Sequence, residues 1–256
     1  MFKSFHNFLR RILDIENIYH HFYISIFQRN KKYVLVDMGA NKGLFAKEFL
    51  RRCSISKAVL IEPDPSLAKD LRSDFPEKNI YILNAAIGPE VSESVPFYLS
   101  KNQEASSLNK ELVKGHGLVD EGSQVNVRMT TLKEVCSLFD LTKIDLLKID
   151  IEGAEYDLLE NLSKEDFKKI DQISVEFHDF IDPELRERTE KCIKKIRSHG
   201  YLFIYAGTTY LYGSPYENCL FFKKRVALIG LIFRLLRVPK AFALRIFVAC
   251  KQKVDR

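Results

Sequence analysis

The stretch KYVLVDMGANKGLFAKEFL, residues 32–50, decides how the chain begins to fold. Its apolar run VLV predicts a buried strand that ends at the acid Asp37, and the apolar spacing over residues 43–53 predicts a helix. Between them stand Gly39 and Gly43, where glycine permits positive φ angles and lets a ligand approach the backbone. The spacing is G-x-x-x-G rather than G-x-G-x-x-G, so an ordinary dinucleotide phosphate cradle is not indicated.

Strand-like and helix-like segments alternate from residue 33 onward. Strands are predicted at residues 34–37, 58–62, 80–84, 144–149, 173–177, 201–205 and 218–223, and helices at 43–53, 65–75, 131–139, 154–162 and 183–199. Two extra strands, at 95–99 and 125–129, flank a polar loop. This alternation predicts an α/β fold with a mostly parallel sheet and helices on both faces. Ligands of such sheets bind beyond the carboxyl ends of the strands.

Polar residues follow each of the first three predicted strands. The first strand is followed by an acid, two glycines and an amide, which are Asp37, Gly39, Gly43 and Asn41. Glu62 follows the second strand, about 20 residues beyond the glycine turn, where an acid can accept both hydroxyls of a ribose. Asn84 and Ala85 follow the third strand, where an amide can read an adenine edge. Each residue alone fits a turn or cap, but the set favours a nucleoside site.

The fourth and fifth strand ends carry more ionisable groups than a buried sheet requires. In DLLKIDIEGAE, Lys148, Asp150 and Glu152 alternate, and in SVEFHDF so do Glu176 and His178. Because unpaired buried charge is costly, they form either an ion-pair cluster or a catalytic pocket. In the pocket, His178 or Asp150 is the base and Lys148 orients a hydroxyl. A divalent metal held by Asp150, Glu176 and His178 is a further option that spacing alone does not favour.

Composition describes a globular chain of one domain. Of the 256 residues, 46% are apolar and 29% are charged, which excludes the disordered and fibrous classes. The five cysteines are scattered without a C-x-x-C pair, which argues against a zinc site or a disulfide framework and favours a reducing cytoplasm. Residues 223–256 carry ten Lys or Arg and one acid, whereas residues 1–222 have a net charge of −3. The tail is therefore expected to bind an anionic partner.

Terminal segments flank the predicted body, residues 31–224. Apolar spacing over residues 2–29 predicts one or two amphipathic helices in an N-terminal segment, residues 1–30. In the tail, residues 225–256, an apolar run of eight residues ends at Arg234 and is too short to span a bilayer. Its interleaved bases suit a helix on an anionic membrane surface, at the inner face of the membrane. The alternative is packing on the N-terminal helices or on the second subunit of a homodimer. The scarcity of polar residues argues against nucleic acid.

The motifs VLVDMGANKG, IEPDP, NAAIG, IDLLKIDIEGAE and VEFH, in this order, resemble the FkbM family of S-adenosylmethionine-dependent methyltransferases. The resemblance covers roughly residues 33–222. It implies the Rossmann-like class I methyltransferase sheet of seven strands, whose last strand is antiparallel. It also implies that the glycine turn holds the methionine part of the cofactor, Glu62 the ribose, and Asn84 with Ala85 the adenine. Ser106 and Ser107 match a serine pair in the region that would select the acceptor.

The resemblance implies an O-methyltransferase that acts on a hydroxyl of a saccharide or related natural product. A sulfonium methyl is already a strong electrophile, so the protein needs mainly to align the acceptor oxygen and take its proton. The alternative is a binding module or membrane-associated interaction protein that kept the nucleoside fold without catalysis. The intact acid–glycine–acid set and the polar fourth and fifth strand ends favour the enzyme.

Overall fold

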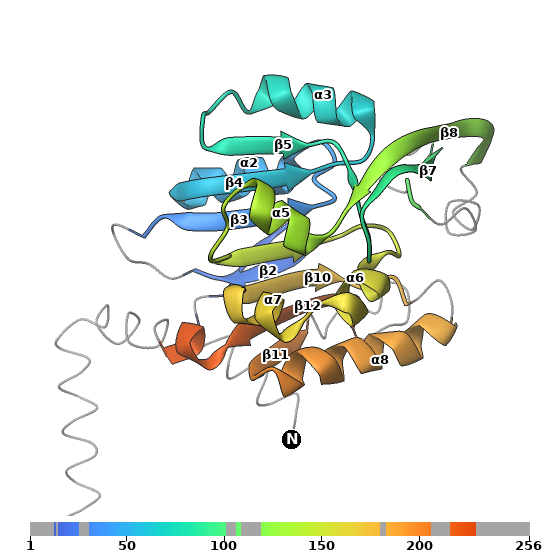
Figure 1. Ribbon diagram of the computed structural model, residues 1–256. Coiled ribbons are helices and arrows are strands. Elements are labelled where there is room, and N and C mark those ends of the chain that lie inside the picture. The colour runs from blue at the N-terminus through green and yellow to red at the C-terminus, as the bar shows by residue number, and fades with distance from the viewer. Residues whose placement is uncertain are drawn as a thin grey trace, which may run out of the picture.

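The computed structural model describes residues 13, 15–25, 31–100, 106–108, 119–179, 183–205 and 216–228. Its centre is a seven-stranded sheet with the order β11-β12-β10-β9-β3-β4-β5 (Figure 1). The strands are β3 (Tyr33–Met38), β4 (Ile55–Ile61), β5 (Ile80–Leu83), β9 (Leu146–Ile149), β10 (Gln172–Glu176), β11 (Tyr201–Tyr205) and β12 (Asn218–Lys223). β12 runs antiparallel to both of its neighbours, and the remaining pairs are parallel. The predicted mostly parallel α/β sheet is confirmed.

Two hydrophobic cores cover the two faces of this sheet. On one face pack α5 (Leu132–Leu138), α6 (Glu155–Asn161), α7 (Lys164–Lys169) and α8 (Pro183–Ser198). On the other face pack α2 (Leu44–Arg52), α3 (Pro65–Asp74) and an N-terminal hairpin. Successive strand side chains alternate between the cores, so that Val36 belongs to the first core and Leu35 to the second. The helices therefore cover both faces, as predicted.

Local capping explains where several helices begin. Thr131 caps α5, because its side chain accepts a hydrogen bond from the backbone amide of Glu134. Asp64 caps α3 in the same way, and Pro65 follows it at the first helical position. Ser163 begins α7, a short helix that the sequence analysis did not predict, with a capping box.

The N-terminal segment contains a hairpin where helices were predicted. β1 (Ile15–Ile18) and β2 (His21–Ile24) pair antiparallel, and the rest of the predicted helical segment lies outside the described residues. The loop residues Tyr19 and His20 both have positive φ, 46° and 71°, as a two-residue hairpin turn requires. The helix prediction was wrong for residues 15–24 because tertiary contacts outweighed the helix-like apolar spacing.

Side chains of β10 hold the hairpin on the sheet. The backbone amide of Ile24 donates to Gln172 Oε1 at 2.7 Å, and Gln172 Nε2 donates to the Ile24 carbonyl at 3.2 Å. The amide of Phe22 donates to Ser174 Oγ at 3.1 Å. Because Gln172 and Ser174 alternate along β10, both face the hairpin. The same alternation directs Glu176 toward this face.

A smaller sheet extends beside the main one. It contains β6 (Ala86–Ile87), β8 (Val119–Thr130) and β7 (Ser92–Ser100), in that order, and projects to the right in Figure 1. Phe97, Val127 and Met129 form its own small core. The predicted extra strands at 95–99 and 125–129 lie within β7 and β8. Ser107 pairs with Tyr98 of β7 through backbone hydrogen bonds, which brings the serine pair against this sheet.

The chain continues past β12 into a helical turn over residues 224–228. Val226 is buried in the hairpin-side core, and Arg225 donates to Asp171. The first residues of the predicted tail, 225–228, therefore pack on the body. Residues 229–256 lie outside the described part, so the amphipathic tail stays a prediction. Within the described residues, no helix is both long and apolar enough to cross a membrane.

Candidate active site

A cleft of about 570 Å³, counted out to its open mouth, lies beyond the carboxyl ends of β3, β4, β5 and β9. Its lining includes five of the predicted site residues, which are Gly39, Asn41, Glu62, Ala85 and Asp150. Phe97 of β7, Ser106 and Leu108 close it from the side of the smaller sheet. These residues are far apart in the sequence, and the carboxyl ends of the parallel strands bring them together.

The glycine turn is shaped by close backbone approach. Gly39 has a φ of +76°, and a Cβ built on it would lie 1.7 Å from the carbonyl oxygen of Asp150. Only glycine fits between the ends of β3 and β9 at this point. Gly43 has a φ of +70°, and its Cβ would lie 2.7 Å from the side chains of Leu71 and Phe75. Gly43 therefore permits α2 to pack on α3 and does not line the cleft.

Glu62 is held at the cleft by two backbone amides. Its oxygens accept from the amide of Asn41 at 2.8 Å and from the amide of Asp64 at 2.9 Å. The residue is only 5% exposed, and this burial raises the pKa of Glu62 to about 7. A carboxylate can accept about four hydrogen bonds, so lone pairs remain for hydroxyl groups in the cleft.

Asn84 fastens two loops rather than facing the cleft with its amide nitrogen. Its Nδ2 donates to the carbonyls of Glu62 and Pro63, each at 2.8 Å. Both of its amide hydrogens are therefore used within the protein, and only Oδ1 could accept from a ligand. The adjacent Ala85 lines the cleft with a small side chain. Their predicted roles in holding adenine stay predictions.

Lys148 and Asp37 are buried beneath the glycine turn. Lys148 Nζ donates to the Gly39 carbonyl at 2.7 Å and lies 3.3 Å from Asp37 Oδ1 and 3.4 Å from Asp150 Oδ2. Burial alone would lower the pKa of Lys148, but the two carboxylates outweigh it and hold the pKa above its ordinary value. Burial raises the pKa of Asp37, and Lys148 offsets this only in part. Neither residue is among those that line the cleft, and their predicted roles stay predictions.

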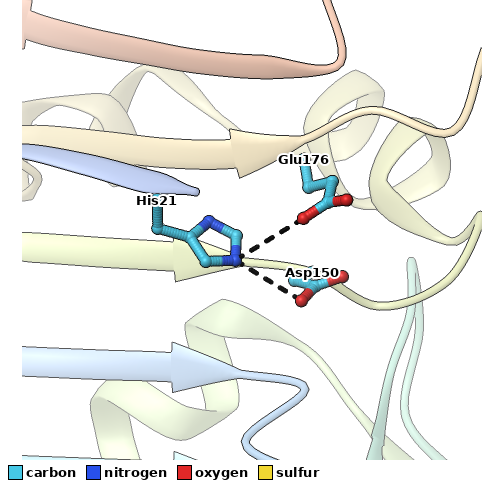
Figure 2. Close-up of side chains that lie close together, drawn as sticks. All are labelled: His21, Asp150 and Glu176. Atoms are coloured by element: carbon cyan, nitrogen blue, oxygen red, sulfur yellow. Dashed lines mark hydrogen bonds and ion pairs between the residues drawn. The ribbon is translucent and has the colours of Figure 1, made fainter. Parts of the chain in front are cut away.

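Asp150 and Glu176 meet His21, which β2 brings to the ends of β9 and β10 (Figure 2). His21 Nε2 lies 3.4 Å from Asp150 Oδ2 and 3.7 Å from Glu176 Oε2. Burial lowers the pKa of His21, which keeps the imidazole neutral at pH 7. For Asp150 burial acts in the opposite direction, yet Lys148 and His21 lower its pKa below the ordinary value. Burial and the nearby Asp150 raise the pKa of Glu176 to about 8.

His178 lies in a separate arrangement from Glu176. Its Nε2 is 3.2 Å from Glu152 Oε2, and its Nδ1 is 3.1 Å from Glu155 Oε1. Burial alone would lower the pKa of His178, but Glu155 and Glu152 raise it well above its ordinary value. The imidazole is therefore protonated at neutral pH. The raised pKa favours the imidazolium over the neutral base, and the choice between His178 and Asp150 as the base stays a prediction.

The predicted metal set of Asp150, Glu176 and His178 does not converge as one group. Within the described residues, two groups have ligand atoms within 4.8 Å of one another, and both contain Asp150. One adds His21 and Glu176, and the other adds Glu152 and His178. The alternation expected of Glu152 ends with β9, since Glu152 has a φ of 52° in the turn that follows.

Sequence reasoning missed two residues of this region. His21 lies in a segment interpreted as helix, and no local signal links it to residues 150 and 176. Glu155 is fully buried at the start of α6, where it accepts from the amides of Ile151 and Gly153 and orders the turn. Its place in the first turn of a helix, where acids are stabilised, was a signal for that role.

Comparison with known proteins identifies a family and several similar proteins. A family model described as the methyltransferase FkbM domain matches residues 37–203. Methyltransferase 1 of Beauveria bassiana is 28% identical over 160 residues, which are 57% of this chain and 64% of that protein. The AMB antimetabolite synthetase AmbE of Pseudomonas aeruginosa is 25% identical over 217 residues, which are 73% of this chain and 10% of the synthetase. The chain thus spans less than two thirds of each relative. A crystal structure of methyltransferase FkbM from Methylobacillus flagellatus is 16% identical, with a TM-score of 0.48, over 82% of this chain and 48% of that one.

Gly39→Ala tests the close approach in the turn. Gly200 is a matched control, because it also has a positive φ, +86°, but a Cβ there would meet nothing within 4 Å. Gly200→Ala should cost only the left-handed backbone strain, about 1–2 kcal/mol in the free energy of unfolding. Gly39→Ala should cost clearly more, because its Cβ also collides with Asp150. Urea unfolding of both variants measures the difference, and equal costs would contradict the packing of β3 against β9.

Proposed function

Because its residues 37–203 match the family model, the chain belongs to the FkbM methyltransferase family, and we propose that it is an S-adenosylmethionine-dependent O-methyltransferase of saccharide or related natural-product hydroxyls. The observation that carries the proposal is the placement of two carboxylates along one cleft. Glu62, which the family resemblance assigns to the ribose, follows β4, and Asp150 follows β9, with the end of β3 between them. The two relatives named above support methyl transfer or biosynthetic chemistry in general and do not identify the acceptor.

The residues of the cleft fit the proposed cofactor. Glu62 offers carboxylate lone pairs for the ribose hydroxyls, and Gly39 lines the cleft in the turn that the resemblance assigns to the methionine part. Ala85 leaves room for a flat base. S-adenosylmethionine would supply an electrophilic methyl group on a sulfonium sulfur. The carboxylates near the cleft favour this positive charge.

Asp150 is the best-placed group for the acceptor. It lines the cleft, and its side chain is 27% exposed. Its lowered pKa keeps it ionised, so it can orient an acceptor hydroxyl by accepting its hydrogen bond and can receive the proton as the new oxygen–carbon bond forms. Lys148 fixes the position of this carboxylate from below. His178 holds Glu152 at the cleft wall rather than taking the proton.

Cofactor binding should depend on the ionisation of Glu62. The pKa of Glu62 is about 7 without ligand, and the ionised form is the better acceptor for ribose hydroxyls, so binding should release a proton. Affinity for S-adenosylmethionine should therefore rise as pH increases from 6 toward 8 and then level off. Glu62→Gln should lose about 2–3 kcal/mol of binding free energy and this pH dependence. Calorimetry at several pH values measures both, and unchanged affinity in the variant would overturn the ribose assignment.

Mass spectrometry of glycans and lipids tests the reaction. Cells without the gene should lack one product that is heavier by a methylene group in wild-type cells. Asp150→Asn should lower turnover by roughly 100-fold or more and fail to restore that product, although the variant binds S-adenosylmethionine. Asp157→Asn is a matched control, because Asp157 pairs with Arg188 on the surface. Cofactor binding without any methylated product would favour the non-catalytic binding module.

The sequence of the C-terminal tail, with bases interleaved among apolar residues, suits a membrane surface. We propose that residues 229–256 lie on an anionic membrane surface. The full chain should then sediment with anionic liposomes at low salt, and added salt should weaken this binding, because each base near the surface contributes about 1 kcal/mol. Removal of residues 229–256 should abolish sedimentation and leave the folded body with Val226 in place. A full chain that ignores such liposomes would favour packing or dimerisation.

A further inference from the structure

We propose that His21, Asp150 and Glu176 form a binding site for one divalent transition-metal ion of the manganese or zinc type. The three residues come from β2, the end of β9 and the end of β10, and their polar atoms point toward one another in Figure 2. One imidazole nitrogen and two carboxylate oxygens are a donor set that such ions accept. His21 precedes residues 37–203, so the family match does not include it.

The distances fit a shared ion. His21 Nε2 lies 3.4 Å from Asp150 Oδ2 and 3.7 Å from Glu176 Oε2. Two ligand atoms that are each about 2.1 Å from one ion lie about 3.4 Å apart in a tetrahedral arrangement. The observed separations are near this value. They are also long for hydrogen bonds, so direct hydrogen bonding does not fully account for the convergence.

The second group, Asp150 with Glu152 and His178, fits a metal less well. Both ring nitrogens of His178 contact a carboxylate, and one of these, Glu155, is fully buried and already accepts from the amides of Ile151 and Gly153. His21 contacts both carboxylates of its group through the single nitrogen Nε2. The His21 group is therefore the better candidate of the two.

The surrounding charge also favours a cation. In this region, five acidic side chains form ion pairs with only three basic side chains. The bases are Lys148, His21 and His178, and the acids are Asp37, Asp150, Glu152, Glu155 and Glu176. Lys148 is shared between Asp37 and Asp150, and the ion pair of Glu176 is with His21. An added divalent ion would reduce the repulsion between the carboxylates.

The site would open toward the cleft. His21 is 3% exposed, whereas the side chains of Asp150 and Glu176 are 27% and 24% exposed. The imidazole therefore supports an ion from the buried side, and the carboxylates leave coordination positions on the solvent side. On the proposed function, such an ion could bind a hydroxyl of the acceptor beside Asp150 and make it more acidic.

Titration of the full chain with Mn²⁺ tests the site. After chelator treatment and its removal, we expect calorimetry to show one bound Mn²⁺ per chain, and electron spin-echo spectra to show coupling to an imidazole nitrogen. His21→Gln should lower the affinity by at least about tenfold and remove that coupling. His20→Gln is the matched control, because His20 is the exposed residue just before β2, and this variant should bind Mn²⁺ as the wild type does. Thermal melting of each variant without metal checks that it folds.

Two further variants separate the groups. Glu176→Gln should weaken Mn²⁺ binding, and Glu152→Gln should not, whereas the reverse order would assign the ion to His178 and overturn the proposal. Absence of Mn²⁺ and Zn²⁺ binding, or binding that survives His21→Gln, would also overturn it. S-adenosylmethionine is titrated separately, so that a chain that binds the cofactor but no metal contradicts this inference and leaves the proposed function standing.

Discussion

The geometry of the cleft depends on the contacts that the buried ammonium group of Lys148 makes. It joins the carbonyl of Gly39 at the end of β3 to the carboxylates of Asp37 and Asp150. Removing one partner of a buried ion pair leaves an uncompensated charge and typically costs about 3–5 kcal/mol. The position of the glycine turn therefore depends on two features. Lys148 binds the Gly39 carbonyl, and the absence of a Cβ on Gly39 lets the turn lie against the Asp150 carbonyl. Both constraints place Gly39 and Asp150 in the lining of one cleft.

Strand alternation explains why a buried sheet carries so many polar groups. Along β9 and β10, the side chains that face α5 to α8 are apolar, whereas Lys148, Gln172 and Ser174 face the hairpin side. The outer edges of a hairpin have backbone N–H and C=O groups that need hydrogen-bond partners, whereas most backbone groups of a helix are already paired within the helix. Gln172 and Ser174 supply those partners, and Asp150 and Glu176 at the strand ends meet His21. This face of β9 and β10 is therefore polar because a hairpin, rather than a helix, covers it.

Much of the fold could be predicted because its signals are local. The run before Asp37, the glycine turn and the acid at Glu62 each depend on a few neighbouring residues, and the strand-end rule then gathers them at one cleft. The hairpin could not be predicted in this way. Its turn, Tyr19 and His20, lacks the glycine or asparagine that usually marks positive φ, and its register depends on β10, which is distant in sequence. The protonation of His178 could not be predicted for a related reason, since its pKa depends on Glu155 in another element.

The position of Asp150 makes the N-terminal hairpin part of the cleft's chemistry. The same oxygen, Oδ2, lies 3.4 Å from Lys148 Nζ and 3.4 Å from His21 Nε2. One carboxylate oxygen thus shares its charge between the sheet and the hairpin, and both neighbours help to keep the pKa of Asp150 low. A shift of the hairpin would remove one of these two neighbours and change both the orientation and the basicity of the carboxylate that faces the acceptor side of the cleft. The segment that precedes residue 37 therefore bears on the strength of the proposed proton acceptor, although it lies outside the matched family domain.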